Sequence, residues 1–535
     1  MYRSRRRFLQ AGCTALGLGG LHTLWPQLEL IPTAAAQSTP SGYRALVCIF
    51  LNGGNDSWNL LIPGDAERHE RYKTARSGLF NAQTGAGLAI PRPDGDGVVA
   101  GQTLPAALSI AGGNYGVNPF CPELAQLYNE NKLAFLSNIG PLVEPVTRAT
   151  AGLRRLPPQL YSHSDQTNLW QIGSGSNANA AQGWGGQIAG RVALPATSTA
   201  GLPPVISIAG QTRFLVGNAP GGAALLPYTL STSSTTPAST ISNYAASGGS
   251  ATQFQPQRRA ALQELLALNN PQPFTAEYRT VFQRAIALAE QVINPAIQAI
   301  PTTDPINGGG SIGFTWPNTG LANQLRQVAR IIRISRNTAG FTSNIAANRQ
   351  VFFVSIGGFD THADQITSPT QALAHHGLLQ QVSQAVFAFQ RAMAAMGADQ
   401  DVTLFTISEF ARTLNSNGDG TDHAWGGVQF AVGGAVNGGQ IIGRYPSMVL
   451  DNTLTGATSI AANQGESYSR GQFIPTIAVD QFAATCARWM GVADSELPVL
   501  FPNIDNFANG PHANAGATPS FAVFGRTLPN LLAGV

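Results

Sequence analysis

The chain carries few charges for its length. Charged side chains make up 11% of its 535 residues, against about 25% in ordinary soluble domains. The formal net charge is only +3, and no basic cluster follows the N-terminal segment. Because proteins that bind nucleic acid usually present a basic patch or stripe, the sequence predicts no nucleic-acid partner. Its 59 glycines and many neutral polar residues are instead common among exported proteins.

Cysteine is scarce as well, with four residues in the whole chain. Cys13 lies in an apolar N-terminal stretch without a lipoprotein-type cleavage context, so no lipid anchor is expected. The other three, Cys48, Cys121 and Cys486, are an odd number in a large chain and form no disulfide framework. One bridge among them is allowed and none is required.

The first residues predict export. Ser4 to Leu9 reads Ser-Arg-Arg-Arg-Phe-Leu, the signature of a twin-arginine signal, and a short apolar stretch follows. Small residues at 34–36 predict cleavage before Gln37, so that residues 1–36 form the signal peptide; an ordinary secretory signal with a basic start is the alternative. No later segment reaches the roughly 20 apolar residues of a membrane span. We therefore expect a periplasmic or secreted protein with no membrane span once the signal is removed.

Residues 43–535 are expected to form an α/β domain with a mostly parallel sheet and helices on both faces. Three apolar runs, at 45–51, 351–356 and 402–407, suit strands buried on both faces. Between the last two runs, apolar residues recur at three- and four-residue steps from Leu379 to Met396, and Gly397 is placed to end this helix. Strand, helix and strand in this order predict a βαβ unit.

Other segments are less regular. Apolar spacing predicts two further helices, near 278–292 and 321–332. Residues 190–255 contain short β-like runs and then a Ser/Thr/Ala/Gly-rich stretch, which indicates an inserted, loop- and β-rich cap within the domain.

Polar residues gather where the three apolar runs end. Because ligands of open α/β sheets bind beyond the carboxyl ends of the strands, these residues are expected to share one crevice. Carboxylates and imidazoles brought together in this way suit a divalent cation such as Zn²⁺ or Mn²⁺. The residues are Asn52, Asn55, Asp56 and Ser57 after the first run, Asp360 and His362 after the second, and Glu409, Arg412, Asp422 and His423 after the third.

Each of these residues also has a structural interpretation. Asp360 would cap the element after its strand, Glu409 and Arg412 would form an ion pair, and Asp422 with His423 would orient a turn. A second group, Tyr161 to Asp165, contains Ser162 and His163 and offers either a nucleophile with a ligand or base, or a loop that these side chains fix. His375 and His376 precede the apolar stripe of their helix and are expected at the surface.

The strand-end strings resemble an exported bacterial family known as domain of unknown function 1501, which is placed by remote similarity in the alkaline phosphatase and sulfatase-like superfamily. Gly-Phe-Asp-Thr-His and Glu-Phe-Ala-Arg-Thr are its most specific strings. The matching segments are Leu51–Asp56, Ser162–His163, Gly183–Trp184, Gly357–His362, Ser408–Thr413, Asp422–Trp425, Gly433–Gly434 and Gly438–Gly439.

This resemblance implies a two-metal hydrolase of phosphate or sulfate esters on an alkaline phosphatase-like sheet. The implied metal ligands are Asp56, Asp360, His362, Glu409 and His423. The implied catalytic residues are Ser162, His163 and Arg412, with Ser57 as the second choice of nucleophile. Phe410 stands where the hydrolases usually place a histidine, so that one metal position is short of a ligand.

Three functions stay open on the sequence alone. The first is a metal-dependent hydrolase that acts on a small-molecule or surface-polymer ester. The second is a degenerate hydrolase fold that serves as an exported binding or assembly factor for a protein partner or a surface polymer. The third is a metal-dependent enzyme that transfers a phosphoryl or similar group. The missing histidine favours the second function, whereas the retained acidic and histidine residues favour the other two.

Overall fold

The structure is a computed structural model of the whole chain, which divides into two compact units, residues 1–42 and 43–535. The predicted signal peptide, residues 1–36, lies outside the described residues. The structure describes residues 42–176, 180–192, 202–218, 222, 224–238, 255–268, 279–280, 283, 285–310, 312–336, 345, 347–450, 466–507, 520–523 and 526–529.

A nine-stranded sheet forms the centre of the second unit. Parallel pairs predominate, and β14 is antiparallel to both of its neighbours. The predicted α/β class with a mostly parallel sheet is therefore confirmed. In spatial order the strands are β15 (Gln440–Ile442), β5 (Leu133–Gly140), β14 (Gly427–Val432), β11 (Val402–Ile407), β1 (Arg44–Asn52), β10 (Arg349–Gly357), β6 (Val205–Ser207) and β9 (Tyr228–Thr229), with β18 (Ile477–Ala478) beside β5.

The three predicted strands are neighbours at the middle of this sheet. β1 lies between β10 and β11 and runs parallel to both, with Val47 opposite Phe352 on one side and Leu404 on the other. Alternate residues of β1 belong to two different apolar clusters, because successive side chains of a strand point to opposite faces. Burial on both faces explains the uninterrupted apolar run that predicted this strand.

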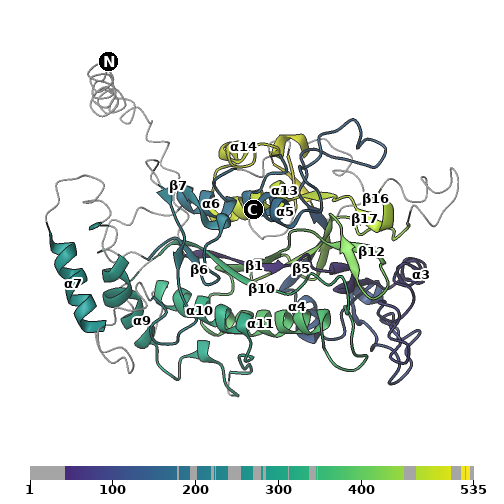
Figure 1. The fold of residues 1–535 in the computed structure, drawn as a ribbon, viewed down its shortest axis with the longest axis horizontal. Coiled ribbons are helices and arrows are strands. Elements are labelled where there is room, and N and C mark those ends of the chain that lie inside the picture. Colours follow the sequence, from purple (N-terminus) through teal and green to yellow (C-terminus); the bar gives the residue numbers. More distant parts are fainter. Residues whose placement is uncertain are drawn as a thin grey trace, which may run out of the picture. The chain divides into compact units, whose positions relative to one another are not determined.

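Helices cover both faces of the sheet (Figure 1). α4 (Pro122–Asn129), α10 (Gly320–Ser335) and α11 (His375–Ala395) contribute to one apolar cluster, together with Val47 and Ile49 of β1. α6 (Trp184–Val192) and α13 (Val479–Met490) contribute to the other, together with Leu46 and Cys48 of the same strand. The strand order β11, β1, β10 shows that α11, which joins β10 to β11, carries the chain across β1.

The helix predictions hold where the structure describes the chain. α11 buries the predicted apolar stripe, and Gly397 follows it with a φ of +65°. α10 contains the predicted 321–332 segment. The helix expected near 278–292 is described only in part: residues 279–280, 283 and 285–287 are helical, and the π-helical turn Leu288–Ile293 follows and leads into α9 (Asn294–Gln298).

The region expected to be a cap, 190–255, contributes strands to the sheet. β6 pairs with β10 and β9 pairs with β6, so the described part of this region extends the central sheet at one edge. Val205 and Ile206 are fully buried, as the strands of a core sheet require.

The remaining elements are short helices and small two- and three-stranded sheets. They are the helices η2 (Ser57–Asn59), α3 (Ala66–Ala75), η3 (Ala111–Gly113), α5 (His163–Ile172), η4 (Arg213–Leu215), α7 (Gln255–Ala267), η6 (Pro305–Asn307), η8 (Ser469–Gly471), η9 (Asp494–Glu496), α14 (Leu497–Leu500) and η10 (Ile504–Phe507), and the strands β2 (Leu61–Pro63), β3 (Leu108–Ile110), β4 (Tyr115–Val117), β7 (Gly217–Asn218), β8 (Ala224–Leu225), β12 (Arg412–Ser416), β13 (Thr421–His423), β16 (Ser467–Tyr468), β17 (Gln472–Phe473), β19 (Ser520–Val523) and β20 (Arg526–Pro529).

Two further expectations concern a disulfide bridge and a membrane-spanning helix. Cys48, Cys121 and Cys486 are all buried free thiols, so none of the three forms the bridge that the sequence allowed. Among the residues that the structure describes, no helix combines the length and the apolar character that a membrane crossing would need.

Candidate metal centre

Four of the predicted residues meet beyond the carboxyl ends of the central strands. Asp360 and His362 follow β10, Glu409 follows β11, and His423 ends β13, which pairs with β12 in a hairpin. His163, the first residue of α5, joins them from a distant part of the sequence. Open α/β sheets bind ligands at this edge, and the predicted gathering of these side chains is present.

Asp360 is the centre of this group, which we call the histidine cluster (His163, Asp360, His362 and His423). One ligand atom from each of His163, Asp360 and His423 lies within 4.8 Å of the others. The carboxylate of Asp360 lies 3.6 Å from Nε2 of His163, 3.4 Å from Nε2 of His423 and 3.1 Å from Nε2 of His362. Nε2 of His362 also lies 2.9 Å from Nε2 of His423. All three histidines thus direct the same ring nitrogen toward one carboxylate.

The opposite ring nitrogens of His163 and His423 are held by oxygen acceptors. Nδ1 of His423 donates to the main-chain carbonyl of Tyr161 at 2.9 Å. Because a carbonyl can only accept, the proton of this imidazole is on Nδ1 and its Nε2 carries the lone pair. Nδ1 of His163 lies 2.9 Å from Oε1 of Glu409. When this Nδ1 donates to the carboxylate, the imidazole of His163 has the same tautomer as that of His423.

His362 has an equivalent partner but is more exposed. Its Nδ1 lies 3.2 Å from Oδ1 of Asp422, the residue that precedes His423. The side chain of His362 is 45% exposed, against 24% for His423. Oxygen acceptors on Nδ1 and an inward Nε2 are the arrangement in which proteins usually hold metal-binding histidines.

The surroundings of the cluster shift the pKa values of its members in different directions. Burial lowers the pKa of His423, and the nearby charges of Arg412 and His163 lower it further, which favours the neutral, metal-binding imidazole. The hydrogen bond to Glu409 raises the pKa of His163 against the opposing effect of burial. Burial tends to raise the pKa of Asp360, but the hydrogen bond and charge of Arg412 outweigh it, so its pKa is lowered and the carboxylate is kept ionised.

The donor types of the cluster fit Zn²⁺ or a similar ion. Two imidazole nitrogens and a carboxylate oxygen are ligands that Zn²⁺ uses in catalytic sites. A tetrahedral centre with metal–ligand bonds of about 2.1 Å places its ligand atoms about 3.4 Å apart. His163 lies 3.6 Å from Oδ2 of Asp360 and His423 lies 3.4 Å from Oδ1, so these two distances are to different carboxylate oxygens; one ligand atom from each of the three residues lies within 4.8 Å of the others.

Glu409 is fully buried and links two parts of the site. Its Oε1 accepts from the amide of Gly53 at 2.8 Å and lies against Nδ1 of His163. Gly53 follows β1 and has a φ of +122°, and a Cβ there would lie 2.4 Å from the amide nitrogen of Asp360. Only glycine fits this turn, which lets the loops after β1 and β10 touch.

Arg412 fastens three loops of the site to each other. Its guanidinium donates to the carbonyls of Gly54 at 2.8 Å and Thr421 at 3.0 Å, and it also reaches the carbonyls of Gly53 and Phe359. The same group bonds to the carboxylate of Asp360. Arg412 is completely buried, so its donors are directed to the protein rather than to solvent.

One family model matches a part of the chain that contains most residues of this site. Residues 318–458 match the family model described as "Protein of unknown function (DUF1501)". No curated protein matches the chain. The DUF1501 match includes four of the five predicted metal ligands and Arg412, whereas His163 and the strand β1 lie outside it.

Asp56, the fifth predicted ligand, has other partners. Both of its carboxylate oxygens accept from Arg76, at 2.7 and 2.8 Å, and Gln365 donates to Oδ2. The side chains of Asp56 and Arg76 are fully buried. Burial tends to raise the pKa of Asp56, but the charges of Arg76 and His375 and its hydrogen bonds outweigh this and lower it. The structure therefore places Asp56 in a buried ion pair beneath the site.

The two candidate serine nucleophiles are engaged with the protein. Ser162 is the N-cap of α5, and its hydroxyl donates to Asp165 at 2.7 Å. Ser57 is buried, and its hydroxyl accepts from the amide of Val428 in β14. Both hydroxyls thus contribute to local structure.

His375 and His376 are buried, so the prediction that they lie at the surface is wrong. They begin α11, but Nε2 of His375 bonds Oδ1 of Asn55 and Nδ1 of His376 accepts from Asn118. These partners come from distant segments, which helix spacing alone does not reveal. Burial lowers the pKa of His375 to about 4 and that of His376 to about 3.

Sequence reasoning missed two contributors to the cluster. The carbonyl of Tyr161 orients His423, and a main-chain acceptor leaves no residue-type signal. Tyr161 has a φ of +72°, which is rare for an aromatic residue and is known at functional sites. Arg470, which pairs with Asp422, lies on a hairpin that the sequence did not single out.

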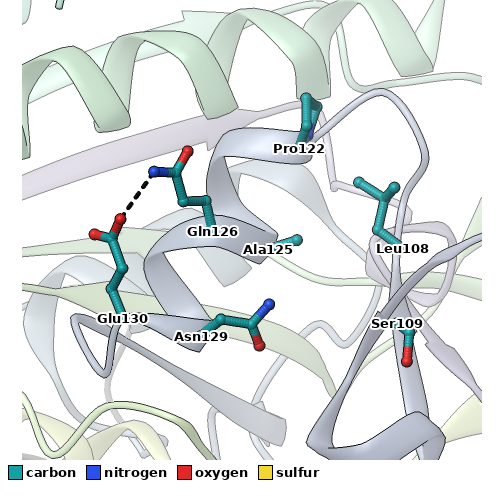
Figure 2. Close-up of a pocket in the computed structure, with 7 residues that line it drawn as sticks. All are labelled: Leu108, Ser109, Pro122, Ala125, Gln126, Asn129 and Glu130. Atoms are coloured by element: carbon teal, nitrogen blue, oxygen red, sulfur yellow. Dashed lines mark hydrogen bonds between the residues drawn. The ribbon is translucent and has the colours of Figure 1, made fainter. Parts of the chain in front are cut away.

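A surface hollow of about 470 Å³ lies at a different place, between β3 and α4 (Figure 2). Glu130 is its one ionisable side chain, and it is bonded to Gln126 and Arg391. The hollow therefore lacks a converging set of polar groups. It is lined by Leu108, Ser109, Pro122, Ala125, Gln126, Asn129 and Glu130.

Proposed function

We propose that the protein is an exported, metal-dependent hydrolase of phosphate or sulfate esters, on an alkaline phosphatase-like fold. The observation that carries this proposal is the convergence of Nε2 atoms on Asp360, with Nδ1 of each histidine held by an oxygen. His163, Asp360 and His423 would hold one divalent ion, Zn²⁺ or Mn²⁺. Three protein ligands leave a position for substrate or water, as catalytic sites require.

A bound divalent ion would supply Lewis-acid polarisation of the ester and would lower the pKa of a water molecule. The protein's own part is to position these groups. Arg412 holds the loop of Asp360 in place, and Glu409 orients His163. The ligand side chains of Asp360 and His423 are 47% and 24% exposed, so an ester can approach them from solvent.

His362 is assigned as the proton acceptor in this proposal, although the sequence grouped it with the ligands. Asp422 lies beside its Nδ1, as in an aspartate–histidine pair that acts as general base, and its Nε2 accepts a proton once its contacts with His423 and Asp360 are replaced by water. In hydrolysis a water oxygen bonds to phosphorus or sulfur and its proton passes to Nε2 of His362. The bond to the alcohol oxygen breaks, and the alcohol leaves with that proton.

The second candidate function is a binding or assembly factor with a degenerate site. It is favoured by the serines, because Ser162 caps a helix and Ser57 is buried. A phosphoryl transferase with the same site is the third candidate, in which an acceptor hydroxyl replaces water. The binding or assembly factor would bind a protein partner or a surface polymer. The transferase would act on a small-molecule or surface-polymer ester.

The proposal predicts different outcomes for Asp360→Asn and His362→Gln. Protein purified without chelator should hold about one Zn²⁺ or Mn²⁺ per chain, measured by mass spectrometry. Asp360→Asn removes a charged ligand and should lose the ion. His362→Gln should keep the ion, while hydrolysis of aryl phosphate or sulfate falls about 100-fold or more, the usual effect of losing a general base.

Asp364→Asn is the matched control, since this exposed residue lies in the same loop. It should retain both the ion and the activity. An unchanged metal content in Asp360→Asn would show that the site is wrong. A metal-loaded wild type without hydrolytic activity would favour the binding or assembly factor.

A further inference from the structure

Two arginines lie next to the histidine cluster, Arg412 and Arg470. The whole chain has only two lysines, Lys73 and Lys132, and both are in ion pairs with carboxylates outside the cluster. In the proposed hydrolase, a guanidinium beside the metal site would bind the oxygens of the anionic ester. Arg412 and Arg470 are the two candidates that the described residues of the site offer.

The contacts of Arg412 exclude it from this role. It is fully buried, and its guanidinium donates to main-chain carbonyls and to Asp360. A substrate that took these donors would have to break the contacts that hold the loops together. Arg412 is a positioning residue, although the sequence suggested a catalytic one.

Arg470 has the opposite properties. Its side chain is 41% exposed, and it bonds to Oδ2 of Asp422, whose Oδ1 faces Nδ1 of His362. One aspartate thus joins the guanidinium to the proposed general base. The arginine is also held at the hairpin between β16 and β17, whose strand β17 directly contacts the cluster because Gln472 donates to the carbonyl of His423.

The backbone of Arg470 is left-handed, as it is at ten of the non-glycine residues that the structure describes. Its φ and ψ are +63° and +14°, and Gly471 follows with a φ of +72°. A left-handed conformation is costly for any residue that carries a Cβ, and glycine would avoid that cost. Strained residues of this kind cluster at ligand sites, where function maintains them.

We propose that Arg470 binds the anionic group of the substrate, a phosphate or sulfate monoester, beside the metal centre. This inference rests on the proposed hydrolase function and adds the residue that recognises the oxyanion. The guanidinium presents planar donors that match the oxygens of a tetrahedral anion. When Arg470 binds the anion, its guanidinium either contacts the anion and Asp422 together or leaves Asp422 for the anion. Because Asp422 also contacts Nδ1 of His362, substrate binding is coupled to the orientation of His362.

The test is Arg470→Gly, measured on protein whose metal content has been determined first. Inorganic phosphate and sulfate serve as probes, titrated by calorimetry at constant ionic strength. The affinity for phosphate should fall about ten-fold or more, the usual effect of losing a charge-assisted hydrogen bond. Thermal stability should stay the same or rise, because glycine relieves the left-handed strain. Arg470→Lys should keep part of the affinity.

Arg336→Gln is the control for a general loss of positive charge. Arg336 pairs with Asp401, which precedes β11 and so lies at the opposite end of the strands. This variant should bind phosphate as the wild type does. Phosphate affinity unchanged in Arg470→Gly, or a metal-loaded wild type that binds no phosphate, overturns the inference. A wild type that holds no metal overturns the proposed function instead, and the metal measurement separates the two results.

Discussion

Phe410 packs against two members of the histidine cluster, His163 and His423. Its ring centroid lies 4.8 Å from that of His163 and 4.5 Å from that of His423, and the side chain is buried. A Cβ on Gly54 would collide with the Phe410 ring, so the phenyl group fills the gap between this turn and the two imidazoles. The Phe410 ring therefore packs against both imidazoles.

We therefore predict that Phe410→His adds no second metal ion. The new imidazole would be buried next to Arg412 and would lack a ready hydrogen-bond partner, which costs about 1–3 kcal/mol. Thermal stability should fall, and a Zn²⁺ titration should still show one binding event. A second event with increased stability would instead indicate a two-metal site that has lost one ligand.

At the scale of the elements, we predict that acid destabilises the folded protein through two buried histidines at the beginning of α11. His375 and His376 are buried and neutral, with pKa values of about 4 and about 3 against 6.5 in the unfolded chain. Below pH 6.5 the unfolded chain binds protons that the folded protein does not. The free energy of unfolding should therefore fall as pH drops from 6.5 toward 4, by about 1.4 kcal/mol per pH unit for each histidine.

His376→Phe is predicted to remove one of these two contributions. Phe120 already packs on the His376 ring, and Asn118 keeps its bond to the carbonyl of Asn59, so a phenyl ring is a conservative replacement. Urea unfolding at pH 5 and pH 7 should show a smaller pH dependence in the variant than in the wild type. An equal pH dependence of the free energy of unfolding in both proteins would mean that the protonation of His376 does not change on unfolding.

The elements also show what could be predicted from sequence. The runs of β1, β10 and β11 and the stripe of α11 were predictable, because burial leaves a pattern with the period of the element. The antiparallel β14 and the role of β6 in the sheet depend on pairing between distant segments. For the site, the strand-end position of Asp360, His362 and Glu409 could be read directly.

The rest of the site depends on contacts that sequence alone does not record. Asp56 is bound to Arg76, 20 residues away, and only the fold reveals that this aspartate is paired. His163 reaches Glu409 across 246 residues. The carbonyl of Tyr161 could not have been found from residue types. The sequence therefore predicts which residues gather at the strand ends better than it predicts the contacts that each of them makes.

At the scale of the whole molecule, the histidine cluster exists only in the folded chain. His163 comes from α5, Asp360 from the loop after β10 and His423 from a hairpin after β11. An unfolded chain cannot present these side chains together, so the proposed metal binding would be coupled to folding. A twin-arginine system moves folded proteins, and this route would allow the ion to be inserted in the cytoplasm before export.

The adjacent Arg5 and Arg6 allow a test of the predicted export route. Replacing Arg5 and Arg6 together with lysine should retain the protein in the cytoplasm with its leader attached, because the export receptor reads the arginine pair and not its charge. Arg7→Lys is the matched control, since Arg7 occupies the variable position of the signature, and this variant should be processed normally. Fractionation with detection of the precursor and mature forms distinguishes them. Because the cluster forms on folding, the retained double variant should still bind its ion. Normal processing of the double variant would indicate ordinary secretion, in which the chain crosses unfolded and must acquire its metal outside.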